Sequence, residues 1–408
     1  MVNAQSTPKA GWEVKTLGEV CEFARGLTYK KTDEVDHSSN AVLRANNVSL
    51  ETKSLNFDKI KFIHEDIEIP ESKKVRNGSL LICTASGSKK HLGKVALIDA
   101  DYAYAFGGFM GLLTPHENIS SKYFFYSLTG KEYENFIAEL SDGANINNLK
   151  FSQLQEFRIT VPPLAEQERI VGILDEAFEG IAAATAQAEK NLHNARELFQ
   201  SVLQSTFSPK GDDWVEKTLK EMAKEFGRGK SKHRPRNADF LYGGQYPFVQ
   251  TGDIRNSDHL ITKYSQTYSE EGLAQSKLWP EGTVCITIAA NIAETGILNF
   301  DACFPDSVIG MIPDPEKSIG GYIEYLLQFF KVELQRQGKG SAQDNINLGT
   351  FKDQTFPFAP VNKQQAIVEK LDALSEETKR LEAIYERKKA ALTELKQSLL
   401  QKAFAGEL

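Results

Sequence analysis

The second half of this sequence repeats the first, and this repetition constrains the fold more than any other feature. Trp12–Val20 reads WEVKTLGEV, and Trp214–Met222 reads WVEKTLKEM. Residues 163–207 align without a gap on residues 360–404, with 16 identities in 45 positions, where roughly three are expected by chance. The period of about 200 residues is too long for a solenoid. The chain is therefore a tandem duplication of one module.

Each module begins with a segment that mixes short apolar runs with Gly, Pro and Asn. The runs at Leu80–Cys83 and Val284–Ile288 predict buried strands, and helices are expected near Lys122–Glu139 and Gly321–Arg336. This alternation is typical of a compact α+β domain. We predict one such domain in residues 1–163 and a similar one in residues 208–360.

Each module ends in a segment that predicts one long helix, residues 164–207 and 361–408. Pro163 and Pro360 precede these segments, and neither helix contains an interior proline. Alternating steps of four and three residues indicate an antiparallel coiled coil that separates the two domains about a pseudo-two-fold. Two separately packed helices are the alternative. The predicted seam contains Ile170, Leu174, Ile181, Leu198, Val202, Ile367, Leu371, Leu381, Leu392, Leu395 and Leu399.

The composition is that of an ordinary globular protein with a net charge of −7. No region is globally basic, so a nucleic-acid role has to rest on local patches. The sequence contains no apolar run long enough for a membrane span and no hydrophobic signal core at its N-terminus. Its four cysteines lie far apart, which favours a reduced, cytoplasmic location and argues against a structural metal site.

Two similar domains at a fixed separation suggest a ligand with a repeat of its own, such as duplex DNA. The best local signal is a basic loop after the second opening motif, RGKSKHRPR, and a weaker loop of the same sign, RGLTYKK, follows the first. Such loops can follow a phosphate backbone, although a solvated loop is the alternative. The candidate DNA-binding residues here are Arg25, Lys30, Lys31, Arg228, Lys230, Lys232, Arg234 and Arg236.

Further polar clusters follow the short predicted strands. Asn and Gln can pair with adenine and Arg with guanine, while Asp accepts from cytosine. The same residue types also build turns, and that alternative stays open for each of them. These candidate DNA-binding residues are Arg44, Asn46, Asn47, Ser88, Lys89, Lys90, Gln250, Thr251, Asp253 and Asn291.

We find no complete motif for a dinucleotide site, a phosphate loop, an amino-methyltransferase, a nuclease or a zinc protease. The seven histidines are scattered and indicate no catalytic triad. We therefore expect no catalysis, no metal and no cofactor in this chain alone.

Taken together, these motifs resemble the specificity subunit of type I restriction–modification systems, over essentially the whole chain. The resemblance rests on the Trp-x-x-Lys-Thr-Leu openings, the Arg-Gly loops and the segment PFVQTGDI at residues 247–254. Its most specific carriers are PPLAEQERIV at residues 162–171 and the closing Gln-Ser-x-Leu-Gln of each module. The helix start of the second module, APVNK, departs from this pattern.

The resemblance implies that each globular domain reads one half of a bipartite, asymmetric DNA target and that the helices set the gap. It also implies docking of two modification subunits, which use S-adenosylmethionine to methylate adenine N6, and of restriction subunits, which use ATP and Mg²⁺. Three other readings stay open: a coiled-coil scaffold joining two protein-binding heads, a fused or novel enzyme, and a modification-only system.

Overall fold

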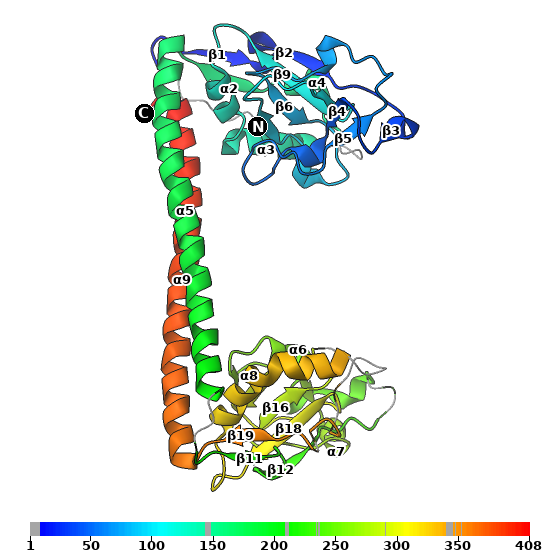
Figure 1. Cartoon of the computed structure of the whole chain (residues 1–408), viewed down its shortest axis with the longest axis vertical. Coiled ribbons are helices and arrows are strands. Elements are labelled where there is room, and N and C mark those ends of the chain that lie inside the picture. The colour runs from blue at the N-terminus through cyan, green and yellow to red at the C-terminus, as the bar shows by residue number, and fades with distance from the viewer. Residues whose placement is uncertain are drawn as a thin grey trace. The chain divides into compact units, whose positions relative to one another are not determined.

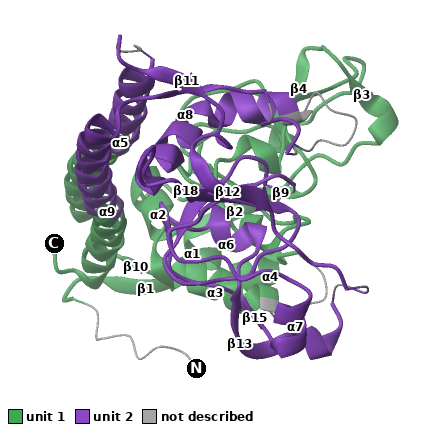
Figure 2. Ribbon diagram, turned by 90° about the horizontal axis from the view of Figure 1, so that it is seen from below, with its two compact units in different colours: residues 1–189, 387–408 green, residues 190–386 purple. Residues whose placement is uncertain are grey.

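The computed structural model describes residues 9–142, 148–208, 212–233, 235, 237–289, 291–339, 346, 348–351 and 353–408. The chain forms two compact units, which Figure 2 shows in green and purple. Unit 1 comprises residues 1–189 and 387–408, and unit 2 comprises residues 190–386. Within the described residues, no helix has an apolar stretch that could cross a bilayer.

The globular part of unit 1 is built on a four-stranded antiparallel sheet, in the order β2-β9-β6-β7. Its strands are β2 (Cys21–Arg25), β9 (Met110–Pro115), β6 (Leu80–Cys83) and β7 (Val95–Leu97). A second sheet has the order β3-β5-β4-β8, with β3 (Glu34–Val35), β5 (Lys61–Ile63), β4 (Asn40–Leu43) and β8 (Ala105–Phe106). The remaining elements are β1 (Glu13–Thr16) paired with β10 (Arg158–Val161), and the helices α1 (Leu17–Val20), α2 (Ser121–Ser127), α3 (Lys131–Asp142) and α4 (Phe151–Leu154).

Unit 2 repeats this plan with one added strand, in the order β12-β18-β16-β17-β14. The strands are β12 (Ala223–Arg228), β18 (Val308–Pro313), β16 (Val284–Thr287), β17 (Thr295–Leu298) and β14 (Leu260–Ile261). Two further strand pairs join β11 (Val215–Lys217) to β19 (Phe356–Phe358) and β13 (Tyr242–Phe248) to β15 (Gln266–Tyr268). The helices of this globular part are α6 (Thr251–Arg255), α7 (Glu270–Ala274) and α8 (Gly320–Lys339). The common strand order confirms the α+β duplication inferred from the sequence.

The strand prediction was close, whereas one predicted helix is broken. All four residues of β6 and of β16 are buried, as expected for strands at the centre of a sheet. The single helix expected near Lys122–Glu139 is two helices, because α2 ends at Ser127 and α3 begins at Lys131 after Gly130. Glycine is a poor helix former, and a chain reversal is favoured there.

The two long helices are α5 (Leu164–Phe207) and α9 (Val361–Ala405). Within each unit they lie side by side (Figure 1), and they run antiparallel. In unit 1, Arg169 donates to the carbonyl of Leu408, and Glu189 lies 3.3 Å from Lys389. In unit 2, Arg196 pairs with Glu382 at 3.1 Å.

The predicted seam is correct for most of its length and wrong at two positions. Ile170, Leu174 and Leu371 are buried, and Ile181, Val202, Ile367, Leu381, Leu392 and Leu399 are partly buried. Leu198 and Leu395, however, are 50% and 47% exposed. The heptad pattern predicts a step of three residues from the preceding seam position to each of these leucines. In the structure this step is four residues long, so the next residues, Phe199 and Lys396, take the inward positions. A straight α-helix has 3.6 residues per turn and drifts away from a strict 3.5-residue repeat.

A buried glutamine fixes the start of each long helix to its own globular domain. Gln167 accepts a hydrogen bond from Ser120 N and donates to the carbonyls of Asn118 and Pro162. Gln364 repeats this arrangement with Ile319 N and the carbonyls of Lys317 and Ala359. Both side chains are fully buried, so all their polar atoms need partners. This requirement explains why the glutamine recurs in both modules.

Candidate nucleic-acid interface

In unit 1, three predicted loops meet at the turn between β8 and β9. The loop after β2 arrives through Leu27, whose amide donates to Phe106 O at 2.7 Å. The loop after β4 arrives through Leu43, whose carbonyl accepts from Gly107 N. The loop after β6 arrives through Thr84 and Ala85, whose amides donate to Phe109 O. Segments far apart in the sequence therefore form one surface.

Close backbone approach explains the glycine of the first Arg-Gly loop. A Cβ atom on Gly26 would lie 1.9 Å from Gly107 O, which no side chain tolerates. In unit 2 a Cβ on Gly229 would lie 2.3 Å from Phe304 O. The Arg-Gly pair therefore packs its glycine against the turn.

Unit 2 gathers the same three loops around the turn before β18. Gly229 N donates to Val308 O, Val249 N donates to Cys303 O, and Ile288 N donates to Ser307 O. Arg228 follows the same surface, since its Nε donates to Asp306 O at 2.7 Å. Each unit therefore carries one copy of the same loop cluster, built from different side chains.

The cationic candidates lie on the outside of these clusters. Lysine and arginine side chains there can each neutralise a phosphate and release its counterions. The guanidinium of Arg25 lies over the Phe151 ring at 5.3 Å, which orients it without removing its charge. Lys30, Lys31, Ser88, Lys89, Lys90, Lys230 and Lys232 are exposed, and Arg234 and Arg236 lie outside the described residues.

Arg44 is the candidate that lies directly against the turn. It is partly buried, lies against Gly107, and its Nε has no hydrogen-bond partner in the described part of the chain. A guanidinium has five N–H donors in a fixed fork. The unpaired Nε is itself buried, so a ligand that docks on this surface can reach only the part of the Arg44 side chain that stays exposed.

Several polar candidates serve the fold. Asn47 is fully buried, its oxygen accepts from Arg44 N, and its nitrogen donates to Asn56 O. The prediction that Asn47 contacts a base is therefore wrong, because its side-chain amide is buried and closes a turn. Asn46 is exposed and donates to Lys59 O.

The candidates after β13 in unit 2 also hold their own loop together. Asp253 accepts from Gln250 N and from Ser265 Oγ, and the Gln250 side chain donates to Gln266 at 2.6 Å. Thr251 begins α6 and is partly exposed. These residues position the loop, as the turn alternative predicted.

The structure adds two residues that no motif indicated. Arg255 on α6 is exposed and donates to the Asn291 side chain at 3.3 Å, so it joins two predicted loops. Phe109 is 74% exposed at the turn itself. A helical arginine and one phenylalanine near a glycine pair carry no sequence signature, so only the fold identifies them.

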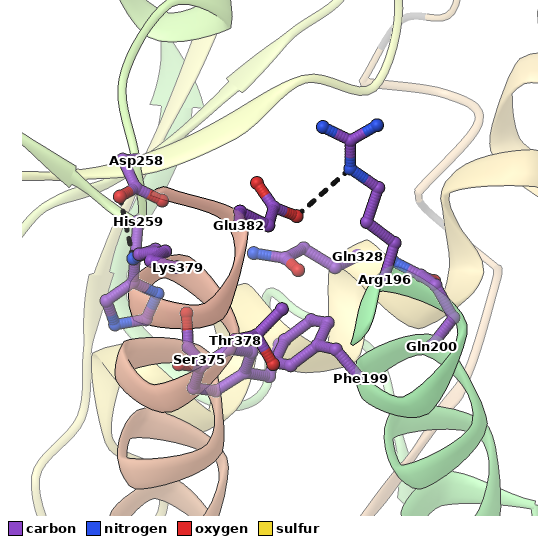
Figure 3. Close-up of a pocket in the computed structure, with 11 residues that line it drawn as sticks. Arg196, Phe199, Gln200, Asp258, His259, Gln328, Ser375, Thr378, Lys379 and Glu382 are labelled. Carbon is purple, nitrogen blue, oxygen red and sulfur yellow. Dashed lines mark hydrogen bonds and ion pairs between the residues drawn. The ribbon is translucent and has the colours of Figure 1, made fainter. Parts of the chain in front are cut away.

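A cleft of about 520 Å³ lies in unit 2 where α5, α8 and α9 meet the loop before β14. Figure 3 shows its charged side chains paired with one another, Arg196 with Glu382 and Lys379 with Asp258. A cleft with balanced charges has no net attraction for an anion. In unit 1, the helix position that matches Ser375 of this cleft is Phe178, whose ring packs edge-on against Tyr126 at 5.3 Å. The two helix–domain joints are therefore packed differently.

One wall of this cleft is a network around His259. Its Nδ1 lies 2.7 Å from Glu324, a carboxylate that is 1% exposed and also accepts from Thr295 and Gln328. The imidazole stacks on Tyr325 with ring centroids 4.7 Å apart. Tyr325 in turn donates to Asp372 of α9 at 2.7 Å. The network thus joins the globular part of unit 2 to the long helix.

Unit 2 is expected to be more stable near pH 6 than near pH 8. Burial opposes the charge on His259, but the Glu324 hydrogen bond and the Glu324 and Asp372 charges outweigh both burial and nearby Lys379, so its pKa is raised above 6.5. A raised folded-state pKa adds stability that is complete below the unfolded pKa and is lost as pH rises through the folded one. Thermal denaturation of the whole chain at both pH values measures the difference.

The matched variants are His259→Gln, which should reduce the pH dependence, and His193→Gln on the exposed face of α5, which should leave it unchanged. An undiminished pH dependence in His259→Gln would show that another group is responsible.

No cluster of three or more His, Cys, Asp or Glu side chains suited to a metal ion occurs among the described residues. The four cysteines, Cys21, Cys83, Cys285 and Cys303, are buried and unpaired.

Comparison with known proteins gives a consistent result. A family model described as the type I restriction modification DNA specificity domain matches residues 9–192 and again residues 211–390. The chain is 25% identical to the EcoKI type I restriction enzyme specificity subunit of Escherichia coli K12, over 98% of this chain and 89% of that protein. It is 24% identical to the StySPI specificity subunit of Salmonella potsdam, with the same coverage.

Solved structures agree on the fold. A chain from a structural study of complex assembly and conformational transition in a type I restriction–modification system matches with a TM-score of 0.81 at 19% identity, covering 99% of this chain and all of that chain. The HsdS subunit from Thermoanaerobacter tengcongensis matches with a TM-score of 0.64 at 19% identity, with complete coverage of both chains.

Proposed function

Because this chain belongs to the family of type I restriction–modification specificity subunits and carries two tandem DNA specificity domains, we propose that each domain reads one half of a bipartite, asymmetric target in double-stranded DNA. The observation that carries the proposal is the pair of matched loop clusters, one in each unit. Each presents exposed lysines beside loops whose side chains differ between the units. Equivalent scaffolds with different side chains are suited to reading two different half-sites.

The long helices set the gap between the half-sites and dock two modification subunits. Leu198 and Leu395 support the docking role, since both are exposed and they occupy matching positions in the repeat. A single exposed leucine is common on protein surfaces, so the support comes from its recurrence at the matching position of both helices. The chain itself is non-catalytic. The modification subunits bind S-adenosylmethionine and methylate adenine N6, and restriction subunits use ATP and Mg²⁺, all in the cytoplasm.

Methylation-sensitive sequencing of host DNA tests the proposal directly. The chain is co-expressed with its cognate modification subunit, and the methylated motif is read from the genome. Two short specified sequences separated by a fixed unspecified gap are expected. A scaffold that joins two protein-binding heads would produce no such motif.

Removing two lysines from the basic loop of unit 2 is expected to weaken DNA binding and flatten its salt dependence. Each lysine that neutralises a phosphate contributes about 0.9 to the slope of log K against log salt, so Lys230→Ala with Lys232→Ala should lower the slope by roughly two. Titration of the assembled complex with its target at several salt concentrations gives the slope.

The matched control is Lys220→Ala with Lys224→Ala. These two lysines are also exposed in unit 2, and Lys224 lies at the opposite end of β12 from Arg228. The control should keep the full slope. Equal slopes in both double variants would mean that the basic loop faces solvent.

A further inference from the structure

Phe109 is an exposed aromatic side chain with a fixed backbone. The side chain is 74% exposed, yet its carbonyl accepts hydrogen bonds from Thr84 N at 3.0 Å, Ala85 N at 3.2 Å and Thr84 Oγ1 at 3.0 Å. The turn closes behind it, because Met110 N donates to Gly107 O at 2.8 Å. A single exposed apolar residue is common on protein surfaces, and what distinguishes Phe109 is its surroundings.

The backbone of Phe109 lies at the point where the loops of the unit 1 cluster meet. Gly108, next to it, approaches Thr28, and Gly107 lies against the partly buried Arg44. The loop that carries Ser88 and Lys90 leaves from Ala85, which is bonded to Phe109 itself. Phe109 therefore lies on the turn that joins the loops proposed to contact DNA.

The matching position in unit 2 shows that the fold does not require this ring. Ile288 N donates to Ser307 O as Thr84 N donates to Phe109 O, and β18 begins at the next residue as β9 does. The backbone arrangement is the same, while the side chain is a serine. We therefore attribute the phenylalanine at this position to the DNA sequence that unit 1 reads and not to the fold.

The apolar feature that the major groove of DNA presents is the C5-methyl group of thymine, and phenylalanine is among the side chains that contact it. Building on the function proposed above, we propose that Phe109 contacts a thymine methyl group in the half-site read by the first domain. The exposed ring then provides base readout by apolar contact, beside the polar readout of Arg44. Because its backbone is held in place, the contact immobilises only the two side-chain torsions.

Replacing thymine by deoxyuridine tests the contact, since it removes only the methyl group. The assembled complex is titrated with target duplexes that carry one such replacement at a time in the first half-site. Wild type should bind about four-fold more weakly at one position, the value of one buried methyl-sized group. Phe109→Ser should bind the normal target about ten-fold more weakly and should no longer distinguish thymine from deoxyuridine there.

Phe109→Ser is chosen because Ser307 already occupies the matching turn in unit 2, so an unchanged melting temperature is expected. Val332→Ala, which truncates an apolar residue 77% exposed on α8, should leave both binding and methyl discrimination unchanged. Together the two variants separate the loss of this ring from the loss of exposed apolar surface in general.

The proposal is overturned if wild type is indifferent to every replacement, or if Phe109→Ser keeps the discrimination. A second result would also overturn it. A 2-aminopurine placed in the half-site would become fluorescent on binding wild type but not Phe109→Ser, while replacement of thymine by deoxyuridine would not change the affinity. The ring would then act as a wedge between bases. A wild-type complex with no preferred sequence would instead refute the proposed function.

Discussion

Deleting one heptad from each long helix, residues 185–191 of α5 and 387–393 of α9, should shorten the gap of the DNA target by about three base pairs and leave both half-sites unchanged. Seven residues span about 10.5 Å of helix, and stacked bases are about 3.4 Å apart along each strand. Seven residues are also nearly two full turns, so the inward faces of the remaining helix stay in phase.

Within unit 1 the two deleted segments meet at Glu189 and Lys389, which form an ion pair. Removing both keeps the antiparallel register of what remains. A control that deletes residues 185–191 alone should lose stability and assembly, because the partner positions no longer match. The measurement is the methylated motif found in host DNA, and changed half-sites with an unchanged gap would contradict the role of the helices as a spacer.

Exchanging residues 1–163 for the corresponding domain of another family member should change one half-site and leave the other half-site and the gap intact. The physical reason is that the globular parts have separate cores, one around Leu80 and Phe124 and the other around Val284 and Tyr322. A change in both half-sites would show that the two domains do not read independently.

The exchange depends on contacts between the domain and the helices of unit 1. Tyr126 donates to Asp175, Thr160 donates to the carbonyl of Phe404, and Gln167 binds the backbone of the segment before α2. A donor domain that has a tyrosine at the position of Tyr126 and a threonine at the position of Thr160 should assemble with these helices. The same exchange with phenylalanine at the donor position that matches Tyr126 tests the contact with Asp175. The stability of this chain should fall, while both half-sites and the gap stay as in the first exchange.

The duplication could be predicted from the sequence because it is a property of the order of the residues. Matched proline, glutamine and aspartate positions mark equivalent joints: Pro163 and Pro360 precede the two helices, and Tyr126–Asp175 recurs as Tyr325–Asp372. Local rules were sufficient for the two helix starts as well, since a proline at a helix start acts on its nearest neighbours. The predicted end of the second helix at residue 408 was wrong, because α9 ends at Ala405.

Local rules failed where a residue's role depended on a segment distant in the sequence. Asn47 has the chemistry of an adenine reader and instead closes a buried turn with Asn56. Leu198 and Leu395 fit a heptad pattern, but drift of the straight helix turns them outward. Phe109 belongs to no motif, and its position follows from hydrogen bonds to Thr84 and Ala85.

The order of residues alone therefore determined that the molecule is two copies of an α+β domain with a long helix, and that its chemistry points to DNA. Those conclusions need only periodicity, composition and local backbone preference. The tertiary structure decided which side chains are presented, because burial and packing are set by contacts between β2, β4, β6 and the turn before β9, elements that are distant in the sequence. The same residue type can read a base or close a turn, and only its surroundings distinguish the two.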